Sequence, residues 1–398
     1  MDKVYNIQDF VNMLGAFYEN IIVVNNFYYK GNGLSASARR TVKYLKEAGE
    51  DVKVLSGRSP YSDGIEPEFK LSTIYIPIFN NLVKKQGYEF AKSDKNIIKE
   101  AIEWADVIHL EEPFFLEMTA AKMAKELNKP ITATYHLHPE NLFASVGLER
   151  SKFINKMMLH FWKKTVFDYA KIISCPTINS KERLKRNKFK AKLEVIPNGL
   201  VIEDPGNLNP SRVDDGYYKV LSIGRLSKEK DEITLLKAMK YSKYAKKISL
   251  IFAGRGPVEQ KLKKEAFKLY RKGIISVYPT FGFYQIGKLQ ELARTSDLYI
   301  HCASIEVEGL SCLEAISTGI VPIIAKAKYS ATTQFAKSKQ SIFKAHDAID
   351  LASKIDYWLE DEQRRKNEAL KYLEYKEKYD IKKSIAALIE MFKEAVDN

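Results

Sequence analysis

The sequence predicts an α/β fold with two doubly wound, Rossmann-like domains. Short runs rich in Val and Ile alternate with longer helical patterns, as in parallel sheets that helices cover on both faces. The same pattern restarts after residues 203–216, a stretch rich in Pro, Gly, Asn and Asp that is typical of a linker. With 398 residues, 45% of them hydrophobic, the chain is long enough to form two cores.

The elements of the first half follow from these runs in chain order. The sequence predicts strands at 21–27, 51–56, 72–78, 106–110, 131–136, 171–176 and 193–197. It predicts helices at 35–48, 94–104, 115–127, 151–169 and 180–187, where apolar residues recur with helical spacing. An amphipathic pattern at 5–20 predicts a further helix, which either packs on the core or contacts a membrane or a partner.

The second half repeats this alternation, with predicted strands at 218–224, 247–254, 274–279, 297–302 and 321–325. The expected domains are therefore 1–205 and 206–380. The helical pattern in the last segment, 381–398, is expected to pack back toward the first domain.

Composition narrows the class of protein. The formal net charge of +14 attracts anions, but it does not choose among nucleic acid, anionic lipid and phosphorylated substrates. No apolar run approaches about 18 residues and the start of the sequence lacks a signal-peptide core, so a cytoplasmic protein is expected. Cys175, Cys302 and Cys312 are odd in number and lie in apolar contexts, which indicates reduced thiols. Neither zinc-ligand spacing nor an Asp-x-Asp pair is present, so we predict no metal site.

A glycine loop follows the first predicted strand. Gly31 and Gly33, with Ala36, fit the G-x-G-x-x-A pattern that lets a backbone approach a ligand at a helix start. A nicotinamide site also needs an acid at the end of the next strand, but Asp51 stands at the start of that strand. We therefore favour a substrate-facing loop over an NAD site.

The second half carries two further loops of this kind. Gly254 and Gly256 lie between a strand and a predicted helix whose first turn holds Pro257, which fits either a tight turn or an anion site. Arg225 and Lys230 follow the strand at 218–224. Two cations there can clamp a pyrophosphate, Arg through its fork and Lys as a point charge; a solvated charged loop is the alternative.

The order of "VIPNGL", "GRLSKEK", "AGRGP" and "EVEGLSCLEA" resembles the family 4 glycosyltransferases with the GT-B fold. The resemblance implies that the two Rossmann-like domains face each other across a cleft. Glu306 and Glu314 match the Glu-x7-Glu element of that family. In the first half, the loop with Gly31 and Gly33 and the segment "ATYHLHPEN" occupy the places of the acceptor-side glycine loop and of a strand-end histidine, His136.

The sequence departs from the family pattern at two positions. Glu308 stands where many members have Phe or Tyr, which makes the site more acidic and leaves the donor sugar open. Asp231 stands where a glycine often follows the lysine, and we expect this to change the following turn.

The resemblance implies roles for the second-domain residues. Glu306 would accept hydrogen bonds from the transferred sugar, and Glu314 would hold the ribose of the nucleotide. The backbone of Gly309, Leu310 and Ser311 would approach the sugar and the diphosphate. A polyol supplies the donors that buried carboxylates need. The alternative for this stretch is a solvated acidic turn, with Glu314 favoured by the helix dipole.

The resemblance also implies a reaction. A hexose would pass, with retention and without a metal, from a nucleotide diphosphate sugar, UDP being the expected nucleotide, to an acceptor hydroxyl. Arg225, Lys230 and the helix starts at Gly256 and Gly309 would stabilise the leaving phosphate.

On the acceptor side, His136 is expected to contact the donor sugar, with a purely structural histidine, or His138 in its place, as alternatives. Glu140 is expected to orient the acceptor. Aromatic residues and lysines alternate over 152–192, which fits either an anionic membrane surface with a lipid-linked acceptor, or core aromatics beside solvated lysines. No nucleic-acid recognition motif accompanies the charge, so nucleic acid is not an expected partner.

Two functions remain open on the sequence. The first is a transferase in the synthesis of cell-surface polysaccharide or glycolipid, located in the cytoplasm or on the inner face of the membrane. The second is a non-catalytic subunit that binds a sugar nucleotide and assists a partner transferase.

Overall fold

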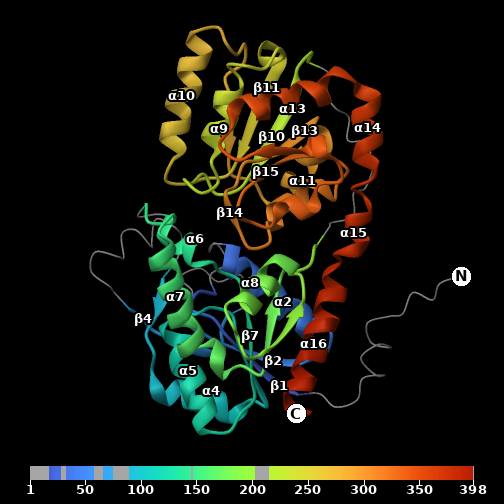
Figure 1. Cartoon of the computed structure of the whole chain (residues 1–398). Helices are drawn as coiled ribbons and strands as arrows, with labels where there is room; N and C mark the ends of the chain where they lie inside the picture. The colour runs from blue at the N-terminus through green and yellow to red at the C-terminus, as the bar shows by residue number, and fades with distance from the viewer. Residues whose placement is uncertain are drawn as a thin grey trace, which may run out of the picture. The chain divides into compact units, whose positions relative to one another are not determined.

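The computed structural model describes residues 18–27, 33–57, 66–74, 89–144, 147–201 and 215–397. Contacts divide the chain into two compact units (Figure 1). The first unit contains Met1–Pro139, Ser151–Gly199 and Ile381–Asn398, and the second contains Glu140–Arg150 and Leu200–Asp380. Most of the helix predicted at 5–20 lies outside the described residues.

The first unit is built on a parallel sheet with the strand order β3-β2-β1-β6-β7-β8-β9. Its strands are β1 (Glu19–Val23), β2 (Asp51–Gly57), β3 (Phe69–Leu71), β6 (Val107–Leu110), β7 (Ile131–Thr134), β8 (Ile172–Cys175) and β9 (Lys192–Val195). Every residue of β6, β7 and β8 is buried. Because successive side chains of a strand point to opposite faces, both faces of this sheet are covered. A short antiparallel pair, β4 (Thr73–Ile74) and β5 (Phe90–Ala91), lies apart from it.

Helices follow the strands of the first unit. They are α2 (Gly33–Glu47), α4 (Lys95–Trp104), α5 (Phe115–Glu126), α7 (Lys152–Thr165), a single 3-10 turn η1 (Phe167–Tyr169), α8 (Ile178–Arg186) and α16 (Ile381–Asp397). The Asp94 side chain caps α4 by accepting hydrogen bonds from the backbone amides of Asn96 and Ile97. The last helix, α16, packs on α2 and on β6, β7 and β8, although it ends the chain (Figure 1).

The second unit has a parallel sheet with the order β12-β11-β10-β13-β15-β17. Its strands are β10 (Tyr218–Ile223), β11 (Ile248–Ala253), β12 (Thr280–Gly282), β13 (Leu298–His301), β15 (Val321–Lys326) and β17 (Ile342–Lys344), and a separate pair is formed by β14 (Ile305–Glu306) and β16 (Tyr329–Ser330). The helices are α9 (Glu232–Ala238), α10 (Glu259–Arg271), α11 (Ile286–Thr295), α12 (Leu310–Ile316), α13 (Ala348–Glu360), α14 (Glu362–Leu370) and α15 (Glu374–Lys378), with 3-10 turns η2 (Ala245–Lys247), η3 (Thr332–Phe335) and η4 (Lys339–Ser341). A further short helix, α6 (Pro139–Ala144), lies at the boundary between the residues of the two units.

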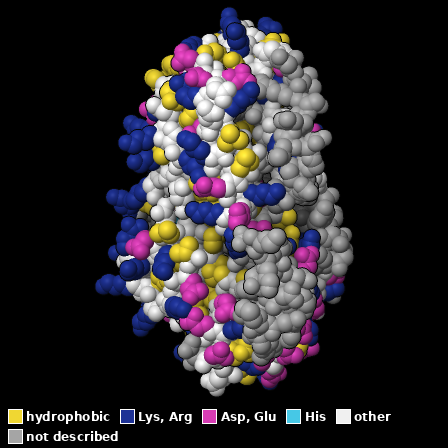
Figure 2. All heavy atoms as spheres, turned by 90° about the vertical axis from the view of Figure 1, so that its right-hand side faces the viewer, with side chains coloured by type: hydrophobic (Ala, Val, Ile, Leu, Met, Phe, Trp, Pro, Cys, Tyr) yellow, Lys and Arg dark blue, Asp and Glu magenta, His cyan; other side chains and the backbone are white. Residues whose placement is uncertain are grey.

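Charged side chains of both signs are mixed on the face that Figure 2 shows. On the face in Figure 2, Lys and Arg side chains lie among Asp and Glu side chains. The net charge of +14 therefore does not by itself locate a surface for an anionic partner.

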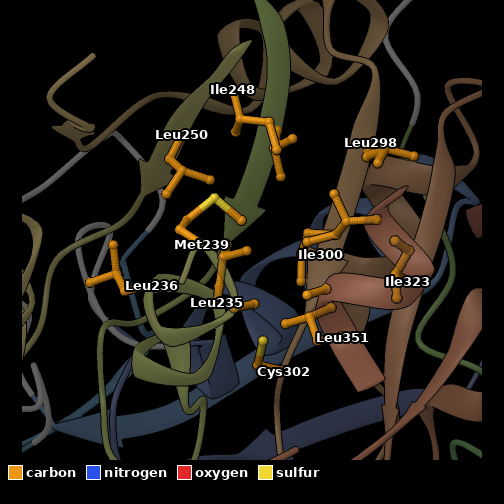
Figure 3. Close-up of a cluster of buried hydrophobic side chains, with 14 of the residues drawn as sticks. Leu235, Leu236, Met239, Ile248, Leu250, Leu298, Ile300, Cys302, Ile323 and Leu351 are labelled. Atoms are coloured by element: carbon orange, nitrogen blue, oxygen red, sulfur yellow. The ribbon is translucent and has the colours of Figure 1, made fainter. Parts of the chain in front are cut away.

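Alternate residues of strand β13 pack in two separate clusters of buried side chains. Leu298 and Ile300 of β13 join one cluster, with Leu235 of α9 and Met239, the residue that follows α9 (Figure 3). Tyr299, between them in sequence, joins the other cluster. Packing on both faces fixes the register of β13, because a slip by one residue would exchange the two sets.

For the second unit, two sequence predictions are wrong in detail and one strand was missed. The run at 274–279 is not a strand, and β12 begins only at Thr280. The short strand β17 was not predicted. Pro257 lies in a turn before α10, which begins at Glu259, so it is not in the first turn of the helix.

Candidate active site

In each of the two large sheets, the first strand in the chain lies between two later strands. The strand order therefore reverses at this first strand. In the second sheet, β10 lies between β11 and β13, and in the first sheet β1 lies between β2 and β6. Ligands of doubly wound sheets bind beyond the carboxyl ends of the strands at such switch points. The sequence-predicted residues Arg225 and Lys230 follow β10, and Glu306 follows β13.

The structure brings Lys230 and Glu306 together. The Nζ atom of Lys230 donates a hydrogen bond to Oε1 of Glu306, although the two residues are 76 positions apart. Both side chains are largely buried, with 19% and 14% of their surfaces exposed. Backbone pairing fixes Glu306 as well, because its carbonyl oxygen accepts a hydrogen bond from the Ala331 amide at 3.0 Å.

Arg225 lies in the same loop and pairs with Glu229. Its Nη2 atom is 2.5 Å from Oε1 of Glu229, which also accepts a hydrogen bond from the Ser227 hydroxyl at 2.6 Å. The Glu229 carbonyl oxygen accepts a hydrogen bond from the Ser304 amide at 2.8 Å. This backbone contact joins the loop after β10 to the loop after β13. Sequence reasoning missed Glu229, which was one of several charges in an apparently solvated stretch.

A second residue that sequence reasoning missed is His301, the last residue of β13. Its Nε2 atom is 3.5 Å from Oε1 of Glu306, which is longer than a strong hydrogen bond. Its Nδ1 atom is 3.0 Å from the Tyr299 hydroxyl. A histidine at the carboxyl end of a buried strand, five residues before Glu306, was the available signal.

These contacts set the charges at neutral pH. Burial alone would raise the pKa of Glu306, but the Lys230 ammonium and His301 outweigh burial and lower that pKa to about 2. In the opposite sense, burial would lower the pKa of Lys230, but Glu306 and Glu229 raise it. Burial lowers the pKa of His301 in spite of the neighbouring carboxylate, so its imidazole is neutral at pH 7. The site therefore offers a carboxylate acceptor and an ammonium donor in contact.

The glycines after β11 are required by the backbone of the neighbouring loop. A Cβ atom on Gly254 would lie 1.8 Å from the carbonyl oxygen of Gly224, and one on Gly256 would lie 2.1 Å from that of Leu226. The Leu226 amide donates a hydrogen bond to the Arg255 carbonyl oxygen at 2.9 Å. The two loops thus hold each other at the distance that only glycine allows.

The second glutamate of the predicted pair lies in α12. Gly309 is the N-cap of this helix, with φ of 88°, and Leu310 and Ser311 are its first residues. Glu314 is in the same helix and is partly buried. The departure at Glu308 is buried, with 5% exposed, and it helps to raise the pKa of Tyr379, after the larger effect of burial.

Asp231 takes the left-handed conformation that glycine favours, with φ of 54°. Its Oδ2 atom accepts a hydrogen bond from the Thr234 hydroxyl at 2.6 Å and lies 2.8 Å from Nδ1 of His346. The backbone of the turn after Lys230 therefore takes, at Asp231, a conformation that glycine favours. The expectation that Asp231 changes this turn stays a prediction.

In the first unit, His136 lies two residues beyond β7 and contacts Glu111, which follows β6. The Nε2 atom of His136 is 2.5 Å from Oε2 of Glu111. Burial would raise the pKa of Glu111, but His136 lowers it, so Glu111 is ionised. The neighbouring His109 is neutral, because burial lowers its pKa to about 4. Sequence reasoning missed Glu111, whose partner is 25 positions away.

Two more buried carboxylates lie at the switch point of the first sheet. Oε2 of Glu112 accepts a hydrogen bond from the Asn25 amide at 2.9 Å, and Oε2 of Glu117 accepts one from the Asn25 side chain at 2.6 Å. Burial, with Glu112 beside it, raises the pKa of Glu117 well above its usual range. This shift favours the protonated form of Glu117, whose side chain is held by the hydrogen bond from Asn25.

The remaining acceptor-side candidates are placed differently. Gly33 begins α2, and a Cβ atom there would meet nothing within 4 Å, whereas Gly31 lies outside the described residues. His138 is buried, with its Nδ1 atom 3.1 Å from the Tyr135 hydroxyl. Glu140 is buried in α6, with 1% exposed. The structure thus gives Gly33 an open environment and encloses His138 and Glu140.

Within the described residues, no cluster of three or more His, Cys, Asp or Glu side chains has the arrangement of a metal site. The three cysteines are buried and unpaired. No helix in the described ranges is long and apolar enough to span a membrane.

Two family models match this chain and together cover most of it. The model for glycosyl transferases group 1 matches residues 206–377, which hold the Lys230–Glu306 pair. The model for glycosyltransferase family 4 matches residues 31–204, which hold His136 and Glu111. This chain belongs to glycosyltransferase family 4.

A relative and two solved structures are similar to this chain over most of its length. The alpha-monoglucosyldiacylglycerol synthase of Streptococcus pneumoniae is 24% identical over 322 residues, which cover 76% of this chain and 70% of that protein. The structure of Anabaena HepE with UDP and glucose matches with a TM-score of 0.70 at 16% identity, over 95% of this chain and 100% of that one. Sucrose-phosphate synthase of Thermosynechococcus elongatus matches with a TM-score of 0.70 at 14% identity, over 94% and 98%. This chain has the GT-B fold.

Proposed function

We propose that this glycosyltransferase moves a hexose from a UDP-sugar to a hydroxyl of a lipid-linked acceptor, with retention of configuration and without a metal, in the synthesis of a glycolipid or cell-surface polysaccharide. Residues 206–380 would bind the donor, and residues 1–205 the acceptor. The observation that carries the proposal is the contact of Lys230 with Glu306 at the switch point of the second sheet. It sets a cation for phosphate beside a carboxylate for sugar hydroxyls.

The leaving group of this reaction is a nucleoside diphosphate, so negative charge develops on its β-phosphate. Lys230 has three N–H donors, and Glu306 needs only one of them. The guanidinium of Arg225 is held by Glu229 and keeps 35% of its side chain exposed. Both cations would stabilise the leaving phosphate as its charge grows, in positions fixed before the donor arrives.

Glu306 would accept hydrogen bonds from the hydroxyls of the transferred hexose, and Glu314 from the ribose. Glu306 is ionised at neutral pH, so it acts only as an acceptor. His136, oriented by Glu111, would contact the sugar, and Gly31, Gly33 and Glu140 would serve the acceptor. The attacking hydroxyl would lose its proton to the departing phosphate.

The lipid-linked acceptor has separate support. The Streptococcus relative is named a glucosyldiacylglycerol synthase. In addition, the 152–192 segment of this chain exposes Phe153, Met157 and Phe161 beside lysines, which suits a protein that contacts the inner face of an anionic membrane.

An assay with labelled UDP-glucose and vesicles that contain diacylglycerol tests the proposal. We expect a labelled glycolipid with the α-configuration at the new bond and continued turnover in the presence of EDTA. UDP-glucose binding without turnover on any acceptor would instead support a non-catalytic subunit. A product of inverted configuration would contradict retention.

A further inference from the structure

A pocket of about 230 Å³ lies in the first unit between α7 and the end of α8. Its lining residues are Lys156, Leu159, His160 and Lys163 from α7, and Arg186, Asn187, Lys188 and Phe189 from the end of α8 and the turn after it. The reaction described above uses none of these residues. The pocket is smaller than typical sites for drug-sized ligands, which start at about 300 Å³, so it suits a small head group.

The lining of this pocket is strongly positive. It contains four Lys and Arg side chains and no carboxylate. Lys163 is neutralised, because its Nζ atom is 2.9 Å from Oδ1 of Asp168. Lys156, Arg186 and Lys188 are exposed, and within the described ranges of the chain none of them forms an ion pair.

Three unpaired cations around one concavity favour a group with more than one negative oxygen. Arginine binds phosphate through two parallel hydrogen bonds, and lysine adds a point charge. A phosphate is therefore the ligand group that this lining fits. No lining carboxylate competes with a bound phosphate for these cations.

Exposed apolar side chains of α7 lie next to the α7 residues that line the pocket. Phe153, Met157 and Phe161 are 76%, 54% and 45% exposed and follow one another at intervals of four residues along α7, so they form a stripe. Residues three apart on a helix are surface neighbours, which sets Lys156 beside Phe153 and His160 beside Met157. Exposure of such a stripe to water is unfavourable, and its transfer from water to the acyl chains of a membrane is favourable.

We propose that this pocket binds the phosphate of an anionic phospholipid, while the stripe of Phe153, Met157 and Phe161 enters the membrane surface. This site makes the membrane contact of the proposed function more specific. It rests on that function only in the choice of a lipid, rather than a free anion, as the ligand. Binding here would hold the first unit at the bilayer that carries the acceptor.

Flotation of the full chain with vesicles tests this site. The vesicles contain either phosphatidylcholine alone or phosphatidylcholine with phosphatidylglycerol. The pocket variant is Lys156→Gln/Arg186→Gln/Lys188→Gln. The matched control, Lys152→Gln/Lys185→Gln/Lys190→Gln, removes the same charge from α7, α8 and the segment after α8, outside the pocket lining. Melting temperature and UDP binding report whether each variant is folded.

We expect the wild type and the control to bind phosphatidylglycerol vesicles, and the pocket variant to bind them at least about tenfold more weakly than the control, with UDP binding retained. Equal losses in the two variants would show diffuse charge attraction and overturn the pocket. Binding of inorganic phosphate to the wild type at millimolar concentration, with no binding to the vesicles, would assign a free anion to the pocket and overturn the lipid. A chain without transferase activity that still shows the tenfold difference would leave this site standing and refute only the proposed function.

Discussion

Lys230 donates a hydrogen bond to Glu306 across the carboxyl ends of two neighbouring strands, β10 and β13. Each side chain is largely buried and compensates the charge of the other. Removing one partner of such a pair leaves an uncompensated charge, which costs more than the pair itself contributes.

Lys230→Met should therefore destabilise the second unit by about 2 kcal/mol, somewhat less than for a fully buried pair. The double variant Lys230→Met/Glu306→Gln should recover part of this loss, because no buried charge is left alone. Urea unfolding measures both. Losses that simply add in the double variant would contradict the coupling of the two residues.

Arg225→Lys keeps the charge of the phosphate clamp but removes its fork. We expect kcat/KM for the nucleotide sugar to fall about tenfold, the value of roughly one charged hydrogen bond. Lys228→Gln is the control, because Lys228 is 60% exposed and pairs with Glu149, and surface pairs contribute little. Equal effects of the two changes on donor kinetics would refute the special position of Arg225.

Glu111→Gln tests a positioning residue. The Glu111 carboxylate can only accept, so the proton of His136 is held on Nε2, the atom 2.5 Å away. Glutamine can donate or accept, so it no longer requires the proton on Nε2. We expect kcat to fall about tenfold or more with little change in the donor KM. Nitrogen NMR of His136 should show a mixture of tautomers, and an unaltered spectrum would assign Glu111 a purely structural role.

Glu232 gives the pH dependence of stability a definite sign. Burial raises its pKa from 4.5 to about 8 in the folded chain. Between these two values the folded state holds a proton that the unfolded state has released, so stability falls as pH rises, by up to about 1.4 kcal/mol per pH unit.

The neutral variant Glu232→Gln should flatten this dependence. It should match the wild type near pH 5 and exceed it in stability near pH 8, as measured by urea unfolding across that range. Wild-type and variant curves that run parallel would show that Glu232 is ionised in the folded state.

The sequence predicted the parallel sheets well where strands are buried on both faces. Runs such as Val107–Leu110 and Val321–Lys326 are nearly all apolar, since neither face meets water. The wrong strand at 274–279 arose from a short apolar run that ends before the true strand at Thr280. The missed β17 has only three residues, too few for a periodic signal.

Pairings between distant residues could not be read from the sequence. The motifs placed Lys230 and Glu306 in one site, but not in contact, because the contact depends on the register of β10 against β13. Glu111 and Glu229 carried no motif at all. Their importance follows from burial beside His136 and Arg225, which only the folded chain shows.

A crystal structure of the protein with UDP-glucose is the most direct measurement of the central claim. We expect the diphosphate within hydrogen-bond distance of Arg225 and Lys230, the hexose against Glu306, and the ribose against Glu314. A nucleotide bound elsewhere, with these four side chains unoccupied by ligand, would contradict the account.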